Sequence, residues 1–392
     1  MTLLFMTSGD NCGKQSSARC IAGQLKATIL AGSYRRMGFL LSDCRFVTRI
    51  SQTNLMNQRI PITLVFTLFL ALTANCASQA DANFQLPGQA LAPGVFQLRE
   101  LDLHLHSGME RPVDLQSWID LAVADGRKVI LLLDHLELYR KTPEQYATWR
   151  EKGKFQAQYP VGPEGHKALY ADFDSVASRK DVLIFKGWEV SEDELDTGLE
   201  MAPLRMADAI GFHISPRNGS TPPNGQTLLK RVRQIKELQK QLPIPMILFH
   251  PFPMRIENLQ RTAKAKGRDP AKIAVKEYRF FRPGEQQDLI LLLKGSSIYI
   301  EMNRDTEHYF DDPVCREAFI ADILPLAKAG VQFTVSTDNH HLAAAKKPFT
   351  PTHYCGPTGV TPACCNTIVR ELMALRARRL LTENAARPQV ER

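Results

Sequence analysis

Seven short apolar runs, rich in residues that favour strands, recur from about residue 97 onward in this chain. Several of them are separated by amphipathic helical patterns. We predict strands at 96–106, 128–135, 182–190, 210–214, 245–250, 298–303 and 332–338. Strands that alternate with helices usually form a parallel sheet. We therefore predict an α/β fold. A distorted (β/α)7 barrel of the TIM-barrel type is the expected architecture, because it buries all seven strands.

Apolar residues at three- and four-residue spacing predict the helices between these strands. The predicted helices cover residues 114–124, 226–241, 286–294 and 315–329. Leu228, Val232, Ile235 and Leu238 form one helix face, with Lys and Arg between them. Gly126 and Gly330 stand where the first and last of these helices should end.

Two long polar segments, 137–177 and 253–283, are predicted to be loops, and loops of that length commonly act as lids or substrate contacts. A catalytic domain is predicted over 90–345. Residues 346–392 are expected to form a loop and a helix, over 365–381, that packs on the barrel.

Residues 1–80 differ from the rest of the chain in charge. They contain eight Lys and Arg residues against two Asp, which gives +6 of the formal net charge of +8. The remainder is close to neutral, so the basic balance does not indicate a nucleic-acid surface. We expect a small-molecule partner and no nucleic acid.

The same segment has the features of a leader. An apolar run at 60–74 follows Arg59, and small residues follow the run up to Ala80. This run is short for a membrane span and typical of a signal peptide. Residues 1–80 are predicted to be an upstream extension plus a signal peptide, absent from the mature protein, which would be periplasmic or secreted. Membrane anchoring through an uncleaved leader or a lipidated Cys76 remains an alternative.

Four cysteines follow the leader: Cys315, Cys355, Cys364 and Cys365. Export would permit a disulfide among the last three, but free or singly paired cysteines are the favoured interpretation. Their spacing is not that of a metal finger.

Every predicted strand carries a side chain able to bind metal near its C-terminal end. These are His104 and His106, Asp134 and His135, Glu189, His213, His250, Glu301 and Asn303, and Asp338 and His340. Residues two apart on a strand point to the same side, so His104 and His106 face one spot. The C-terminal ends of barrel strands converge on one mouth. Imidazole and carboxylate ligands together suit Zn, Mn or Fe.

Each of these side chains taken alone has a structural explanation. A histidine can be a satisfied core residue, Glu189 can be an ordinary ion-pair partner, and Glu301 and Asn303 are interpreted as supporting residues at most. The conjunction favours a metal site, because six histidines and two carboxylates end consecutive strands at the same side.

Taken in their order along the chain, the motifs at the strand ends resemble those of the PHP (polymerase and histidinol phosphatase) domain family. The resemblance covers residues 98–345. The matching features are Asp102-Leu-His104-Leu-His106-Ser, Asp134-His135, Gly187-Trp-Glu189, His213, His250-Pro251 and Asp338-Asn-His340. The resemblance implies a distorted seven-stranded barrel that binds two or three Zn, Mn or Fe ions and hydrolyses phosphoesters.

The resemblance also implies roles for individual ligands. One metal would be held by His104, His106, Glu189 and Asp338. Glu189 would bridge to a second metal, completed by His213 and His250, and a third would be bound by His135 and His340. This sequence departs from the family at one point. The Asp or His expected five or six residues after the His-x-His motif is Arg111 or Pro112 here, with Glu110 as the nearest substitute.

The predicted function is a metal-dependent phosphoesterase. Glu189, Asp338 and His340 are the predicted catalytic residues, with Asp338 orienting the nucleophile and His340 or His341 protonating the leaving oxygen. Phosphate contacts are predicted from Arg111, Arg217 and Arg304, which follow strand ends.

Two alternatives remain. An amidohydrolase-type enzyme would cleave a C–N bond, but such barrels typically use a bridging Lys or carboxylate on strand four, where this chain has His213. A non-enzymatic metal-dependent binding protein would have no need of an open multinuclear site.

Overall fold

The computed structural model describes most of the predicted catalytic domain. The described residues are 95–106, 115–140, 142, 144–145, 162–214, 224–252, 259–260, 263–340 and 348–386. The predicted leader, 1–80, lies outside them. Within these ranges, no helix has both the length and the apolar character needed to cross a bilayer.

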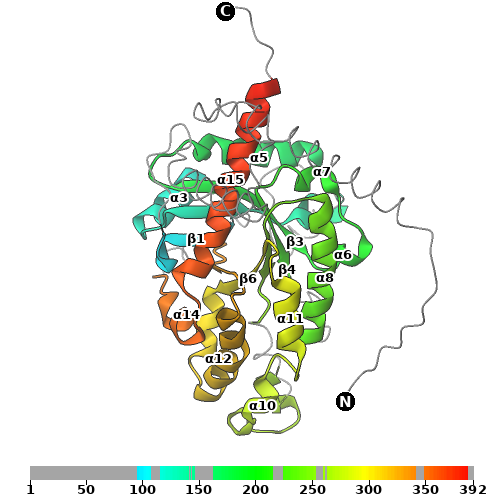
Figure 1. Cartoon of the computed structure of the whole chain (residues 1–392), viewed down its shortest axis with the longest axis vertical. Helices are drawn as coiled ribbons and strands as arrows, with labels where there is room; N and C mark the ends of the chain where they lie inside the picture. The colour runs from blue at the N-terminus through cyan, green and yellow to red at the C-terminus, as the bar shows by residue number, and fades with distance from the viewer. Residues whose placement is uncertain are drawn as a thin grey trace, which may run out of the picture. The chain divides into compact units, whose positions relative to one another are not determined.

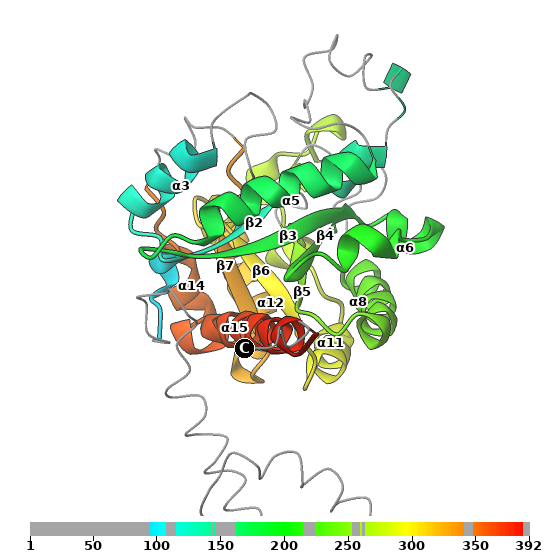
Figure 2. The same cartoon turned by 90° about the horizontal axis from the view of Figure 1, so that it is seen from above.

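Seven parallel strands follow one another around a barrel (Figure 2). They are β1 (Leu101–His106), β2 (Val129–Leu133), β3 (Leu183–Ser191), β4 (Ala209–His213), β5 (Met246–Phe249), β6 (Ile298–Asn303) and β7 (Phe333–Ser336). Each pairs in parallel with the next. The predicted distorted (β/α)7 barrel is confirmed.

The seam between β1 and the end of β7 is closed by backbone hydrogen bonds. The Asp338 amide donates to the His104 carbonyl at 2.9 Å, and the His106 amide donates to the Asn339 carbonyl at 3.2 Å. Two predicted ligand segments, one on each side of the seam, are thus tied together by the backbone itself.

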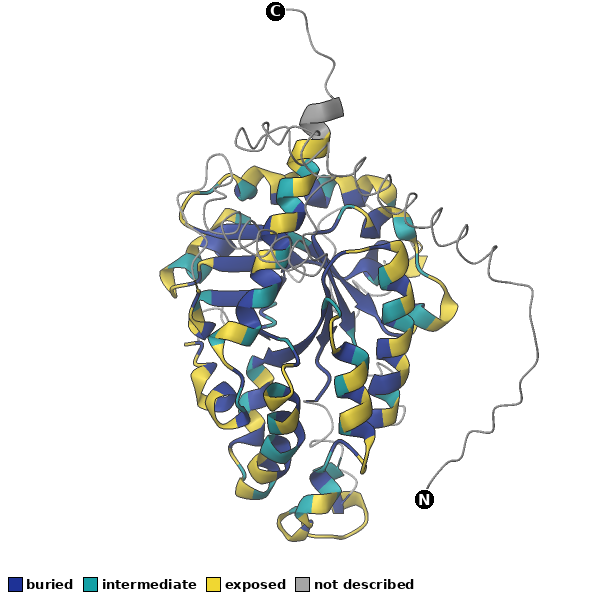
Figure 3. Ribbon diagram, viewed as in Figure 1, coloured by how far each residue is buried: buried dark blue, intermediate teal, exposed yellow. Residues whose placement is uncertain are grey.

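Helices surround the barrel (Figure 1), and the sides of the helices that face the strands are buried (Figure 3). The α-helices are α3 (Leu115–Ala124), α5 (Pro163–Ala177), α6 (Glu194–Thr197), α7 (Met201–Leu204), α8 (Gly225–Gln241), α10 (Val275–Tyr278), α11 (Glu285–Leu293), α12 (Pro313–Lys328), α14 (Thr352–Thr358) and α15 (Pro362–Ala386). Short 3-10 helices are η1 (Leu98–Glu100), η2 (Leu136–Arg140), η3 (Pro270–Lys272) and η4 (Arg304–Tyr309).

The predicted helix at 226–241 is confirmed as α8, and its local sequence explains its bounds. The Asn224 side chain accepts a hydrogen bond from the Thr227 amide at 3.0 Å and caps the first turn. The predicted apolar face is buried. Gly126 and Gly330 have φ values of 90° and 82° just after α3 and α12, as expected of helix-ending glycines.

Three sequence-based expectations were wrong. The predicted loop at 137–177 contains η2 and the fifteen-residue helix α5. Leu169, Phe173 and Val176 are buried and form a narrow apolar stripe along α5. The polar residues around this stripe masked the helical pattern in the sequence. The predicted loop at 253–283 likewise contains η3 and α10. In addition, the first strand begins at Leu101, because η1 occupies the preceding residues.

The C-terminal segment packs against the barrel through α14 and α15. The Asn366 side chain accepts from the Phe96 amide at 2.9 Å and donates to the Phe96 carbonyl at 2.7 Å. Arg379 donates to the Asp208 carboxylate at 2.7 Å. All four cysteines of the described residues, Cys315 among them, are free thiols.

A close approach between β4 and β5 leaves no room for a side chain at Gly211. A Cβ built there would lie 1.6 Å from Cε2 of Phe249. The Phe249 ring is fully buried and stacks on the imidazole of His104, with ring centroids 3.7 Å apart. Because Gly211 has no side chain, the Phe249 ring has room to pack beside His104, a predicted metal ligand.

We predict that Gly211→Ala lowers the free energy of unfolding by about 3 kcal/mol, because the Phe249 ring has to move within a packed core. Chemical denaturation measures the change. Gly356→Ala in α14 is the control, since no atom outside the adjacent residues and the backbone of its own helix lies within 4 Å of a Cβ built there. Pro357 follows and disfavours the helical conformation of a preceding alanine, so we expect a change of less than about 1 kcal/mol in either direction. Equal stabilities for the Gly211→Ala variant and the wild type would contradict the packing argument.

Candidate metal centre

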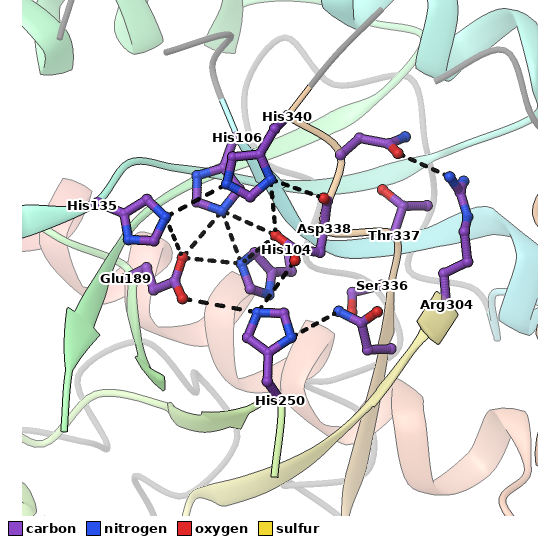
Figure 4. A network of polar contacts seen from close by, with 12 residues as sticks. His104, His106, His135, Glu189, His250, Arg304, Ser336, Thr337, Asp338 and His340 are labelled. Carbon is purple, nitrogen blue, oxygen red and sulfur yellow. Dashed lines mark hydrogen bonds and ion pairs between the residues drawn. The ribbon is translucent and has the colours of Figure 1, made fainter. Parts of the chain in front are cut away.

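The eight side chains predicted as metal ligands gather at the C-terminal ends of the strands. All of them except His213 are labelled in Figure 4. Four overlapping groups each have ligand atoms within 4.8 Å of one another. The groups are His106, His135 and His340; His104, His106 and Asp338; His104, His250 and Glu301; and Glu189, His213 and His250.

Glu189, near the end of β3, is the first centre of this cluster. Its Oε2 lies 3.1–3.3 Å from the Nε2 atoms of His104, His106 and His135. Its Oε1 lies 2.7 Å from Nδ1 of His213. One buried carboxylate thus contacts imidazoles from β1, the end of β2 and β4, which suits a bridging ligand.

Asp338, which follows β7, is the second centre. Its Oδ1 lies 3.3 Å from Nε2 of His104 and 3.2 Å from Nε2 of His106. Its Oδ2 lies 3.3 Å from Nε2 of His250, and Nδ1 of His340 is 3.4 Å from Oδ1. The two carboxylates therefore face His104 and His106 from different strands.

The third group lies on the outer side of His106. The rings of His106 and His340 stack with centroids 3.8 Å apart. The Nε2 atoms of His340 and His135 are 3.5 Å apart. The Nδ1 atom of His135 lies 3.1 Å from the Glu137 carboxylate, a contact that turns Nε2 of His135 toward the cluster.

The backbone is left-handed at two strand ends. His250 has a φ of 50° and Asp338 a φ of 53°, and no other non-glycine residue of the described ranges has a positive φ. Such residues carry strain and cluster at functional sites. Beside Asp338, Thr337 donates to the buried Asp102 carboxylate through its amide at 2.9 Å and its hydroxyl at 2.7 Å. These bonds hold the turn in place.

The carboxylates perturb the two histidines of β1. Burial by itself lowers the pKa of His104, but the charges of Asp338, Glu301 and Glu189 outweigh it and raise that pKa well above its usual value. In the same way, burial by itself lowers the pKa of His106, but the hydrogen bonds that His106 donates to Asp338 and Glu189 outweigh it and raise that pKa to about 9. The centre of the cluster therefore favours positive charge.

The opposite shift occurs at the outer histidine. Burial and the neighbouring His106 hold the pKa of His340 well below its usual value. A neutral imidazole can bind a metal but cannot donate a proton as an imidazolium. The surroundings of His340 thus favour the ligand role over the proton-donor role.

The donor set fits metal ions on electrostatic grounds. Nδ1 of His104 donates to Glu301 at 2.7 Å, so in the neutral ring the lone pair of Nε2 faces the oxygens of Glu189 and Asp338. Lone pairs that face one another at such distances repel, unless a cation lies among them. If all the imidazoles were neutral, the carboxylates of Glu189, Glu301 and Asp338 would give the cluster a net charge of −3, which divalent ions could offset in place of the protons on His104 and His106.

Of the predicted phosphate contacts, only Arg304 lies within the described residues. Its guanidinium donates to Oδ1 of Asn339 at 2.9 Å and lies over the Phe349 ring, apart from the imidazoles (Figure 4). Its contact with substrate stays a prediction. Arg111, Arg217, Glu110 and His341 lie outside the described residues.

Sequence reasoning gave Glu301 less weight than its contacts warrant. Its side chain is fully buried, and its two oxygens contact groups from three other strand ends. The available signal was its position at the end of the sixth strand, the same position that had singled out Glu189 on the third.

No protein-family description matches this chain, and no curated protein matches it in sequence. Among solved structures, it is similar to a histidinol phosphate phosphatase from Lactococcus lactis, complexed with Zn, L-histidinol and phosphate. The identity is 15% and the TM-score 0.35, over 67% of this chain and 92% of that one.

Two further solved structures are similar at lower scores. An amidohydrolase from Burkholderia ambifaria with bound Zn has 13% identity and a TM-score of 0.31, over 68% of this chain and 64% of that one. An adenosine deaminase from Xanthomonas campestris with bound Zn has 10% identity and a TM-score of 0.24, over 72% and 61%. The case for a function therefore rests on the side chains of the cluster.

We predict that Glu189→Gln reduces the metal content of the purified protein, because the amide removes the negative charge that faces four imidazoles. Elemental analysis by plasma mass spectrometry after dialysis against Zn or Mn measures the ions per chain. We expect the wild type to hold two or three and the variant to lose at least one.

Glu192→Gln is the matched control. Glu192 is also buried, three positions further along the chain, but its carboxylate pairs with Nε of Arg231 at 2.9 Å. We expect this variant to keep the metal content of the wild type. A Glu189→Gln protein that is folded and retains all its ions would contradict the bridging role.

Proposed function

We propose that this protein is a metal-dependent phosphoesterase, which hydrolyses a small-molecule phosphate ester at a centre of two or three Zn, Mn or Fe ions. The observation that supports it most is the convergence of six imidazoles and two carboxylates at one end of the barrel. The order of the motifs along the chain, which resembles that of PHP domains, adds the phosphoester as the substrate class.

The contacts of the two carboxylates suggest which residues would hold each ion. His104, His106, Glu189 and Asp338 would hold one ion, and Glu189 would also contribute to a second, held by His213 and His250. His135 and His340 would hold a third. His250 lies 3.9 Å from Glu189 and 3.3 Å from Asp338, so it stands between the first two sets.

Bound ions would supply the charge that activates a water molecule and neutralises the phosphate oxygens. The protein's own groups determine the geometry. The left-handed turn at Asp338 directs its carboxylate into the cluster, where it can accept a hydrogen bond from the attacking water and orient it. Glu189 and its imidazole partners fix the spacing of the ligands. The buried surroundings exclude bulk water from that region.

Cleavage of a C–N bond is the runner-up. Against it, the β4 residue that reaches the cluster is His213, whereas Glu189, the carboxylate that contacts His213, comes from β3. A non-enzymatic metal-dependent binding protein is the other alternative, and hydrolysis of any substrate would exclude it. Export to the periplasm or beyond is part of the proposal, and it rests on the composition of the leader alone.

Hydrolysis of p-nitrophenyl phosphate and bis-p-nitrophenyl phosphate tests the activity. We expect turnover of at least one ester by protein loaded with Mn or Zn, its loss after chelation, and its return when metal is added back. His250→Ala should lower the rate at least about 100-fold, since a metal centre contributes several kcal/mol to transition-state stabilisation.

The control substitution is His308→Ala. His308 is an exposed histidine of η4 that pairs only loosely with Asp311, at 3.5 Å, and its loss should leave the rate unchanged. If elemental analysis finds the metal bound and neither ester is hydrolysed, the phosphoesterase proposal is wrong, and hydrolysis of C–N substrates should be examined.

A further inference from the structure

We propose that Glu301 is a positioning residue for this centre, and that its single carboxylate presets two ligands, the ring of His104 and the backbone of His250. The inference rests on the proposed metal centre, since it explains how two of the ligands of that centre are oriented before a metal binds. It gives specific contacts and a specific task to Glu301, which the sequence had indicated only as a supporting residue at most.

The contacts of Glu301 join four strand ends. Its Oε1 accepts from Nδ1 of His104 on β1 at 2.7 Å and from the hydroxyl of Ser336 on β7. Its Oε2 accepts from the backbone amide of His250, just after β5, at 2.8 Å. The side chain is inaccessible to solvent, so these bonds replace all of its hydration.

The bond to His104 selects a tautomer. With Nδ1 as the donor to Glu301, Nε2 of the neutral ring keeps its lone pair. That atom is the one that faces Glu189 and Asp338, each at 3.3 Å. The Phe249 ring stacks on the same imidazole, with an interplanar angle of 24°, and limits its rotation. Glu301 and Phe249 together leave Nε2 free to bind a metal.

The bond to His250 stabilises an unfavourable backbone. A non-glycine residue with a φ of 50° carries a conformational cost, which its surroundings must offset. A buried amide that donates to a carboxylate makes a strong hydrogen bond, which can offset such a cost. It fixes the point at which the chain leaves β5, and hence the direction of the His250 side chain.

Glu301 could instead be a ligand, because it forms a metal-competent group with His104 and His250. The contacts argue against this. Glu301 Oε1 contacts Nδ1 of His104, whereas Nε2 is the nitrogen that faces Glu189 and Asp338. Both oxygens of Glu301 also accept from fixed donors of the protein, the Ser336 hydroxyl at Oε1 and the His250 amide at Oε2.

Glu301→Gln tests the role. A glutamine side chain keeps the size but offers one acceptor oxygen for two N–H donors, so either His104 or His250 loses its partner. We expect Zn affinity, measured by chelator competition on metal-free protein, to fall about 10–100-fold. The d–d absorption of the Co-loaded protein should change as well, because the ligand geometry changes.

Asp322→Asn is the control for the loss of a buried carboxylate. Asp322 on α12 is 2% exposed and accepts from the Phe280 amide at 2.5 Å, but it touches none of the cluster residues. We expect this variant to lower the melting temperature while Zn affinity stays that of the wild type. Equal Zn affinities for a folded Glu301→Gln variant and the wild type would overturn the inference.

A second measurement needs no variant. Long-range 1H–15N correlations on Zn-loaded wild-type protein should show His104 protonated at Nδ1 and bound through Nε2, and a proton on Nε2 would also overturn the inference. Failure of the metal centre is distinguishable, since wild-type protein would then bind no Zn at all. An intact Zn centre that hydrolyses no ester would contradict the proposed reaction alone.

Discussion

Three carboxylates lie among imidazoles at one end of a parallel barrel, and the surrounding structure is organised around that concentration of charge. Glu189 and Glu301 are buried, and Asp338 is partly buried. Carboxylates taken out of water are costly unless donors or cations surround them. Here the donors are mostly imidazole nitrogens, which can be neutral ligands or charged partners. This choice of partner makes the region stable only when positive charge is present, either as protons or as metal ions.

The barrel solves the problem of bringing these groups together. Seven parallel strands end at one mouth, and each contributes a side chain there without a long loop having to position it. The seam carries particular weight, because the backbone bonds between β1 and the residues after β7 place His104 beside Asp338. Two hydrogen bonds from Thr337 to the Asp102 carboxylate also join the two sides of this seam. The rigid sheet thus holds the ligands at distances that flexible loops could not maintain.

Much of this was predictable, for a physical reason. Burial on both faces makes the strands of such a barrel continuous apolar runs, and a polar residue that ends such a run stands out. The seven strands and the eight gathered side chains were found in that way. The helix α5 was not, because its buried stripe is narrow and lies among polar residues. The ends of the helices depend on capping residues such as Asn224, and a single capping residue is a weaker signal in the sequence than a run of apolar residues.

The sequence by itself determined which residues could reach the mouth of the barrel, because strand periodicity and strand order depend on local patterns of apolar and polar side chains. Only the tertiary structure decided how those residues meet. The left-handed turns at His250 and Asp338, the space that Gly211 leaves for Phe249 and the reach of Glu301 to His104 all depend on distances between segments far apart in the chain. No local pattern encodes such distances, since they arise from the closure of the barrel and the packing of its interior.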